Sequence, residues 1–192
     1  MNDNFNFRQI NEIEKEIIIT SLNKISSGIS QVIYNLKKFL YISIESSSSK
    51  VKFPKIFLIS RNHYELLKTI DSNKILSAGL YLGFIKKGNF LFSLEGAEFL
   101  YISNLYSDFK KLYVNEKGEK SILYGNNILK NMILKIPESI KQNDLLLIFN
   151  QLDEIIALAK SNIDYTNLKN FKQNDIIAIN LIDKGDYLRK SQ

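Results

Sequence analysis

Three apolar runs in the last third of the chain most constrain its fold. They span residues 144–149, 155–159 and 176–182, and each is short and bounded by Asn, Asp or Gln. Short, separated strands of this kind are typical of a small β-barrel or sandwich. The longest apolar stretches are far below the roughly 20 residues that span a bilayer, so we expect no membrane partner.

The first 110 residues predict a small α/β domain with an antiparallel sheet. Asn11 and Glu14 have the spacing of a capping box, and apolar residues at near-helical intervals follow, so we expect a long helix that ends near residues 26–28. Aromatic and β-branched residues predict strands over 37–44 and 55–60, with the serine run 46–49 as a hairpin loop. Further helices are expected over 62–70 and 95–103, and strands over 75–85 and 89–94.

The pattern breaks near residue 110, where we place a domain boundary, so that a second domain occupies residues 111–192. A strand is predicted over 112–114 and a short helix over 119–124, with Gly125 as its left-handed C-terminal residue. A strand over 127–129 follows. The local alternative is a hairpin that turns at Gly125 to Asn127. The fold class is therefore α+β, with an α/β domain followed by a β-rich one.

The composition excludes several kinds of chemistry. The 192 residues include no cysteine and one histidine, which excludes disulfides, thiol nucleophiles, iron–sulfur clusters and multi-histidine metal sites. We predict no catalytic residue, no metal and no cofactor. His63 is interpreted as a capping or surface residue, because no nucleophile lies near it in the sequence. The net charge of +6 suits a polyanionic partner. The first residues do not have the form of a signal peptide, which favours a reducing, intracellular location.

Four segments resemble one known family. Residues 119–130, Glu-Lys-Ser-Ile-Leu-Tyr-Gly-Asn-Asn-Ile-Leu-Lys, resemble the first helix and turn of a PUA domain, the RNA-binding module named for pseudouridine synthases and archaeosine transglycosylases. Residues 183–189, Asp-Lys-Gly-Asp-Tyr-Leu-Arg, resemble its closing strand. Residues 8–14 and 77–84 are similar to the opening and middle of the nuclear import protein seven family of large-subunit ribosome-assembly factors. Two segments depart from the pattern, since Asn131-Met132-Ile133 and Ala157-Leu158-Ala159 stand where glycine-containing turns are usual.

The resemblance implies a C-terminal PUA-like β-pseudobarrel that binds RNA and an N-terminal domain that meets proteins. It implies a non-enzymatic factor in large-subunit biogenesis, whose partners are single-stranded or uridine-rich precursor ribosomal RNA and pre-ribosomal proteins or assembly factors. We expect a monomer in the cytoplasm, or in the nucleolus of a eukaryote. RNA binding requires cations that meet phosphates, and the candidates are Lys160, Lys169, Lys172, Lys130, Lys135, Lys184, Arg189 and Lys190.

Other interpretations remain open. The chain is alternatively an RNA-modifying enzyme, or a subunit of one, that uses the PUA domain to grip its substrate, or a protein–protein adaptor. For each lysine taken alone, a role as a solvated surface residue explains its presence as well as RNA contact does. Basic residues lie around the serine run and the 86–88 turn. They extend the RNA-binding surface or, as we favour, prevent an exposed sheet edge from pairing with another strand. Aromatic residues on the predicted strands are stacking platforms for bases or, in preference, core residues: Tyr81, Phe84, Phe90 and Phe92.

Overall fold

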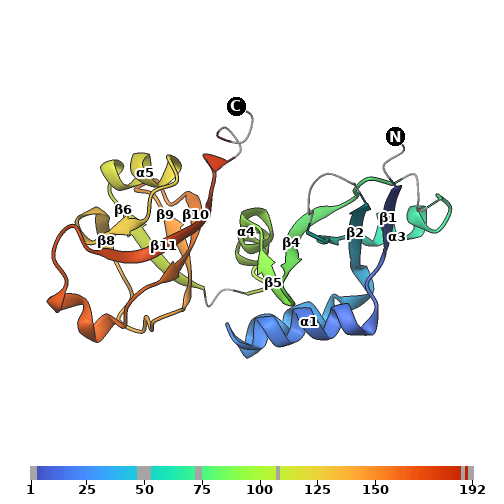
Figure 1. Ribbon diagram of the computed structural model, residues 1–192, viewed down its shortest axis with the longest axis horizontal. Coiled ribbons are helices and arrows are strands. Elements are labelled where there is room, and N and C mark those ends of the chain that lie inside the picture. The colour runs from blue at the N-terminus through green and yellow to red at the C-terminus, as the bar shows by residue number, and fades with distance from the viewer. Residues whose placement is uncertain (1–3, 47–52, 72–74, 107–108, 187–188, 190–192) are drawn as a thin grey trace. The chain divides into compact units, whose positions relative to one another are not determined.

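The structure is a computed structural model that describes residues 4–46, 53–71, 75–106, 109–186 and 189. The chain divides into two compact units, residues 1–106 and 107–192 (Figure 1). Each unit has its own sheet. Among the described residues, no helix has the length and apolar character needed to cross a membrane.

The N-terminal unit is built on a five-stranded sheet in the order β1-β2-β3-β4-β5, in which every neighbouring pair is antiparallel. Helix α1 lies against β5 and packs on α2, and α4 lies against β4. Its strands and helices are β1 Asn4–Gln9, α1 Glu12–Asn23, α2 Ser27–Asn35, η1 Lys37–Phe39, β2 Leu40–Ser46, β3 Lys55–Leu58, α3 Arg61–Leu67, β4 Leu80–Lys86, β5 Asn89–Phe92 and α4 Leu94–Ile102.

The predicted capping box at the start of α1 is present. The Asn11 side chain accepts from the Glu14 N–H, and the Glu14 carboxylate accepts from the Asn11 N–H, each at 2.8 Å. The predicted end of this helix is wrong, because α1 stops at Asn23 and Ser26 starts the next helix by accepting from the Gly28 N–H. Serine and glycine therefore mark a helix start here.

Other predicted elements of this unit shift at their ends. Residues 37–39 form a 3₁₀ turn before β2, and β4 begins at Leu80 rather than near residue 75. Strand β1 was not predicted, although it alternates polar and aromatic residues. Residues 47–52, which include most of the serine run, lie outside the described residues. His63 is exposed in the first turn of α3, where its N–H donates to the Ser60 hydroxyl.

The C-terminal unit is a six-stranded sheet in the order β7-β11-β10-β9-β6-β8. Strand β6 runs parallel to β9, and the other pairs are antiparallel. The two outermost strands are consecutive in the chain and are joined only by η3, so the sheet edges approach each other and nearly close a barrel. The elements are β6 Lys110–Val114, α5 Glu116–Leu123, β7 Ile128–Leu129, η3 Lys130–Met132, β8 Ile133–Lys135, β9 Leu145–Phe149, β10 Ile155–Ser161, η4 Tyr165–Asn170 and β11 Ile176–Asp183.

The barrel core is made by buried side chains of β9, β10 and β11 together with a residue of α5. Leu146, Ile148, Ala157 and Ala178 are fully buried together with Ile122 of α5. The three apolar runs are therefore β9, β10 and β11, and the predicted α+β class with a C-terminal pseudobarrel is confirmed.

Gly125 ends α5 as predicted and excludes the hairpin alternative. Its φ is +89°, and its N–H donates to the Ile122 carbonyl at 2.8 Å, which closes the last helical turn. The helix begins earlier than expected, at Glu116, because the Asn115 side chain accepts from the Gly118 N–H at 2.8 Å.

Candidate nucleic-acid interface

Three of the predicted lysines lie on two segments that are in contact at one corner of the barrel, which we call the lysine corner (Lys130, Lys169 and Lys172). Lys130 opens η3, Lys169 lies in η4, and Lys172 follows that helix. The Lys130 N–H donates to the Asp175 carbonyl at 3.1 Å, and the ammonium of the same lysine donates to the Phe171 carbonyl at 2.6 Å. These contacts bring the 130 and 169–175 segments together.

The backbone of the lysine corner is held by further hydrogen bonds. The Asn131 N–H donates to the Gln173 carbonyl at 2.9 Å, and its amide group donates to the Asn174 side chain at 3.1 Å. The Asp175 carboxylate accepts from the Lys172 N–H at 2.6 Å. Lys169 and Lys172 are exposed, whereas Lys130 is half-buried. The corner thus presents cations to solvent from a backbone that is already in place.

Asn131 explains how the fold tolerates the loss of a glycine turn at this position. Its backbone and side chain both bind the 173–174 segment, so a polar side chain fastens the turn. At the other departure, Ala157 and Ala159 are fully buried in the barrel core. Small side chains there keep the strand packed.

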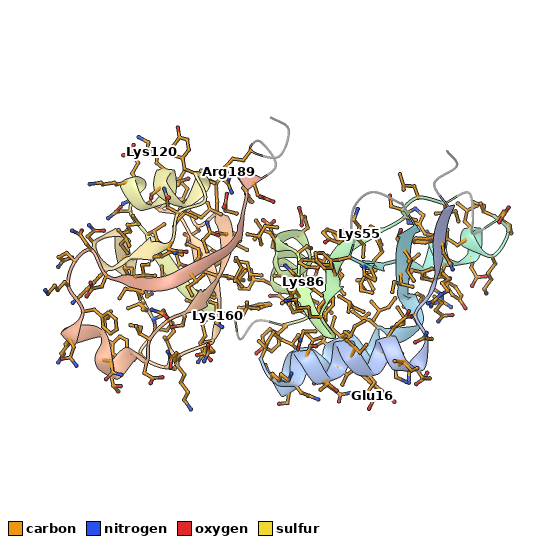
Figure 2. The ribbon with its side chains drawn as sticks, in the orientation of Figure 1. Glu16, Lys55, Lys86, Lys120, Lys160 and Arg189 are labelled. Atoms are coloured by element: carbon orange, nitrogen blue, oxygen red, sulfur yellow. The ribbon has the colours of Figure 1, made fainter. Side chains whose placement is uncertain are left out.

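The other candidates lie elsewhere on the same unit. Lys160 is on β10, where its cross-strand partners are Ile179 and Leu145. Lys135 ends β8, and its ammonium is 5.9 Å from the centre of the Tyr113 ring. Lys184 and Arg189 follow the far end of β11, which is roughly 25 Å from its start at about 3.3 Å per residue. Figure 2 shows Lys160 and Arg189 on separate parts of the unit. Lys190 lies outside the described residues.

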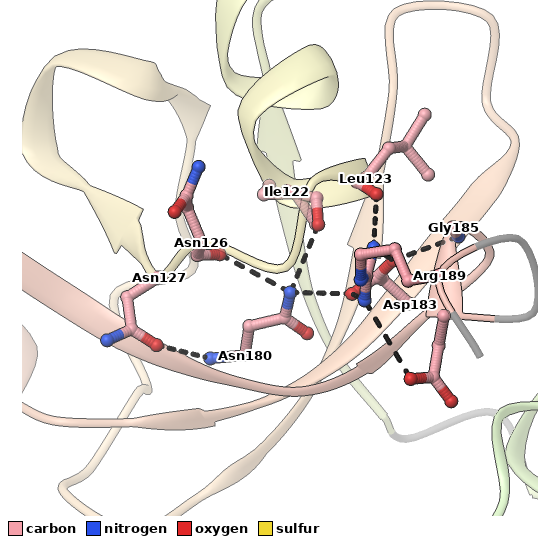
Figure 3. Close-up of polar contacts among 9 residues, drawn as sticks. Ile122, Leu123, Asn126, Asn127, Asn180, Asp183, Gly185 and Arg189 are labelled. Carbon is pink, nitrogen blue, oxygen red and sulfur yellow. Dashed lines mark hydrogen bonds and ion pairs between the residues drawn. The ribbon is translucent and has the colours of Figure 1, made fainter. Parts of the chain in front are cut away.

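Arg189 links the C-terminal end of α5 to the end of β11 (Figure 3). Its guanidinium donates to both carboxylate oxygens of Asp183, at 3.0 and 2.9 Å, and also to the Leu123 carbonyl. The Asp183 side chain is only 2% exposed and that of Arg189 is 34% exposed. The hydrogen bond to this carboxylate raises the pKa of Arg189, although partial burial opposes the shift.

The predicted closing strand over 183–189 is wrong in its conformation. Strand β11 ends at Asp183, and Asp186 and Arg189 are helical. The cause is a turn in which the Asp183 carboxylate accepts from the Gly185 N–H at 2.9 Å, so the chain folds back and Arg189 returns to the same carboxylate.

Sequence reasoning missed Asn180, which ties β11 to α5. Its amide group donates to the Ile122 carbonyl at 3.2 Å, the Asn126 carbonyl at 3.3 Å and the Asp183 carboxylate at 2.9 Å (Figure 3). Its N–H donates to the Asn127 side chain at 3.1 Å. The available signal was one polar residue inside the apolar run 176–182. A polar residue on a core strand is usually kept by its hydrogen bonds.

Among the described residues, no group of three or more His, Asp or Glu side chains is placed to hold a metal ion. The α5–β11 contacts around Asn180 and Asp183 lie toward the other end of β11 from the lysine corner.

Comparison with known proteins finds a family model that matches the C-terminal unit. Residues 110–192 match the UPF0113 PUA domain. The chain is 26% identical over 183 residues to a UPF0113 protein of Archaeoglobus fulgidus, covering 95% of this chain and 94% of the relative. It is 23% identical over 184 residues to the 60S ribosome subunit biogenesis protein NIP7 of Saccharomyces cerevisiae, covering 95% and 96%. The predicted resemblance to the nuclear import protein seven family is confirmed.

Solved structures share the fold over nearly the whole chain. A hypothetical protein of Pyrococcus horikoshii aligns with a TM-score of 0.63 at 13% identity, covering 96% of this chain and 98% of that one. A PUA domain protein of Aeropyrum pernix, solved with tartrate, aligns with a TM-score of 0.62 at 10% identity, covering 97% and 90%. The α+β architecture with a C-terminal pseudobarrel is therefore common to these proteins.

Proposed function

We propose that this chain, whose residues 110–192 match the UPF0113 PUA domain family, is a non-enzymatic RNA-binding factor in large ribosomal subunit assembly. The C-terminal unit binds precursor ribosomal RNA in a single-stranded or uridine-rich stretch. The N-terminal unit binds pre-ribosomal proteins or other assembly factors. The chain works as a monomer in the cytoplasm, or in the nucleolus of a eukaryote. The observation that carries the proposal is the near-full-length similarity to a relative named for 60S subunit biogenesis.

The lysine corner supplies the physical basis for RNA binding. Phosphate contacts fix where a nucleic acid lies on a protein, and the release of condensed counterions drives them. Lys130 uses one N–H on the Phe171 carbonyl, and an ammonium carries three donors, so the others remain for a phosphate. Lys169 and Lys172 are exposed beside it. Lys160, Lys135, Lys184, Arg189 and Lys190 are proposed as weaker or more distant contacts.

The test is RNA affinity after removal of the lysine corner. Full-length K130A/K169A/K172A is compared with K24A/R61A/K68A, which removes the same charge from three exposed positions of the N-terminal unit. We expect the first variant to bind a fluorescent oligouridylate about ten-fold or more weakly, because phosphate contacts dominate affinity. The second should bind nearly as the unchanged protein does.

Two further measurements distinguish a loss of RNA contacts from a loss of folding. The K130R/K169R/K172R variant keeps the charges and should restore most of the affinity, and far-UV circular dichroism should give all variants similar melting temperatures. Equal affinity for the two alanine variants would contradict the lysine corner as the RNA site. Turnover of labelled RNA by the purified chain would contradict a non-enzymatic role.

A further inference from the structure

A separate pocket of about 430 Å³ opens in the N-terminal unit, which we call the aromatic pocket. We propose that it binds one unpaired nucleotide, with the base stacked on aromatic rings and the phosphate held by Lys55. The residues that carry this inference are Ser43, Phe53, Lys55, Phe57, Ser77 and Tyr81.

Strand register places the polar and aromatic parts of the pocket on one sheet face. Ser43 of β2 pairs with Lys55 of β3, and Phe57 of β3 pairs with Tyr81 of β4. Lys55 and Phe57 are two residues apart, so their side chains leave the same face of β3. Cross-strand neighbours on one face lie side by side, which sets a cation next to an aromatic floor.

The floor of the pocket is made of packed aromatic rings. The Phe57 ring is 5.8 Å from the Phe7 ring and 5.6 Å from the Tyr81 ring, measured between centroids. Phe57 is only 7% exposed. Burial raises the pKa of Tyr81 to about 12, with a smaller contribution from the charge of Glu95, so its hydroxyl stays protonated. A floor of packed rings is ready to receive another flat ring without rearrangement.

Phe53 gives the pocket an exposed ring at its rim. This side chain is 38% exposed, yet it is held in place, because its centroid is 5.9 Å from that of Phe84 and the Lys86 ammonium lies 5.0 Å from the ring centre. An exposed ring that is already ordered loses little entropy when a base stacks on it. Figure 2 labels Lys55 and Lys86 on this unit.

The charge of the pocket suits a phosphate. The described lining contains Lys55 and no carboxylate, and Lys55 has no ion-pair partner among the residues that the structure describes. Ser43 donates to the Leu76 carbonyl at 3.1 Å, which fastens the loop on one side of the pocket. The Ser77 hydroxyl lies in the same lining and is available to the edge of a base.

A nucleotide accounts for these features better than a peptide side chain does. The volume falls in the range of roughly 300–1,000 Å³ that is usual for small-molecule sites. Rings beside a cation match the base and phosphate of one nucleotide, because unpaired bases are recognised by stacking on aromatic side chains. An aromatic residue of a peptide would fill the floor but leave Lys55 without a counter-charge. Tyr81 therefore serves as a stacking wall as well as a core residue.

The experiment is a titration of the full-length ¹⁵N-labelled protein with uridine 5′-monophosphate, followed by amide chemical shifts. A free mononucleotide is used so that the result does not depend on RNA binding by the C-terminal unit. We expect the largest shifts at Ser43, Phe57, Ser77 and Tyr81. F53A and K55A should each weaken the affinity about ten-fold, as expected for the loss of one stacking or one phosphate contact.

The matched control is K24A, which removes an exposed lysine outside the pocket lining and should leave the affinity unchanged. Uridine and inorganic phosphate, titrated separately, should each bind more weakly than the nucleotide. Absence of shifts in the pocket, or equal affinity for K55A and the unchanged protein, would overturn the proposal. Shifts with N-acetyl-tyrosinamide but not with the nucleotide would also overturn it, by identifying a peptide site.

Discussion

At the scale of single residues, the side chain of Asp183 is the centre of a hydrogen-bond network in the C-terminal unit. Its buried carboxylate accepts from Arg189 twice, from the Gly185 N–H and from the Asn180 amide group. Removal of the carboxylate takes an acceptor from each of these donors and leaves the buried Gly185 N–H without the partner that the structure gives it. An unsatisfied buried donor costs more than a net hydrogen bond contributes.

We predict that D183A lowers the free energy of unfolding by about 2–4 kcal/mol. R189A should lower it less, since the Arg189 side chain is one-third exposed and water replaces part of its contacts. Urea unfolding followed by circular dichroism measures both. K141A, at an exposed lysine of the same unit, should stay within about 0.5 kcal/mol. An equally small effect of D183A would mean that the carboxylate is not essential to this end of the barrel.

At the scale of elements, the start of α1 is joined to β1 by one ion pair. Arg8 of β1 donates to both oxygens of Glu14, at 2.9 and 2.7 Å, while Glu14 also caps the helix. Burial by itself would raise the pKa of Glu14, but the hydrogen bonds from Arg8 and Asn11 outweigh burial and lower it from its usual 4.5.

This depressed pKa predicts a pH dependence of stability. The stabilisation from Glu14 is complete above pH 4.5, the ordinary value, and is lost as the pH falls through the lower folded-state pKa. E14Q should cost about 1 kcal/mol at neutral pH and should lose less stability than the unchanged protein between neutral and acidic pH. Unfolding curves at several pH values measure the difference, and E16Q, at an exposed glutamate of the same helix, is the control. Parallel pH profiles for E14Q and the unchanged protein would contradict the prediction.

Elements with local signals could be predicted from the sequence. The capping box at Asn11, the left-handed Gly125 and the three apolar runs each depend on residues close together in the chain, and each is present. The helical return of Arg189 could not be predicted in this way, because it depends on a carboxylate that the fold buries. Ser26 was misassigned because serine and glycine occur at both ends of helices.

The candidate site was less predictable than the fold. Each lysine of the lysine corner is visible in the sequence, but their proximity depends on hydrogen bonds between segments about forty residues apart, such as that of Lys130 with Phe171. The same is true of the aromatic pocket, whose floor requires the register of β2, β3 and β4. No local sequence motif predicts the register of these three strands.

At the scale of the whole molecule, the net charge of +6 is modest and basic and acidic residues are interspersed along the chain. Salt dependence should therefore reflect local contacts rather than a broad positive field. We predict that log affinity for single-stranded RNA falls linearly with log salt, with a slope of about −2 from three phosphate contacts. Fluorescence anisotropy between low and physiological salt measures it. A flat response of the unchanged protein would contradict the electrostatic mechanism. The K130A/K169A/K172A variant should show a shallower slope than the unchanged protein.

The connection through η3 has one more consequence for the C-terminal unit. Because β7 and β8 are the two outermost strands and Lys130 begins the link between them, the seam of the barrel and its cationic corner are made by the same few residues. An unpaired strand edge invites pairing with another chain, and this seam brings two such edges toward each other. Lengthening the link by insertion would therefore expose the unit to self-association at the same time as it displaced the lysine.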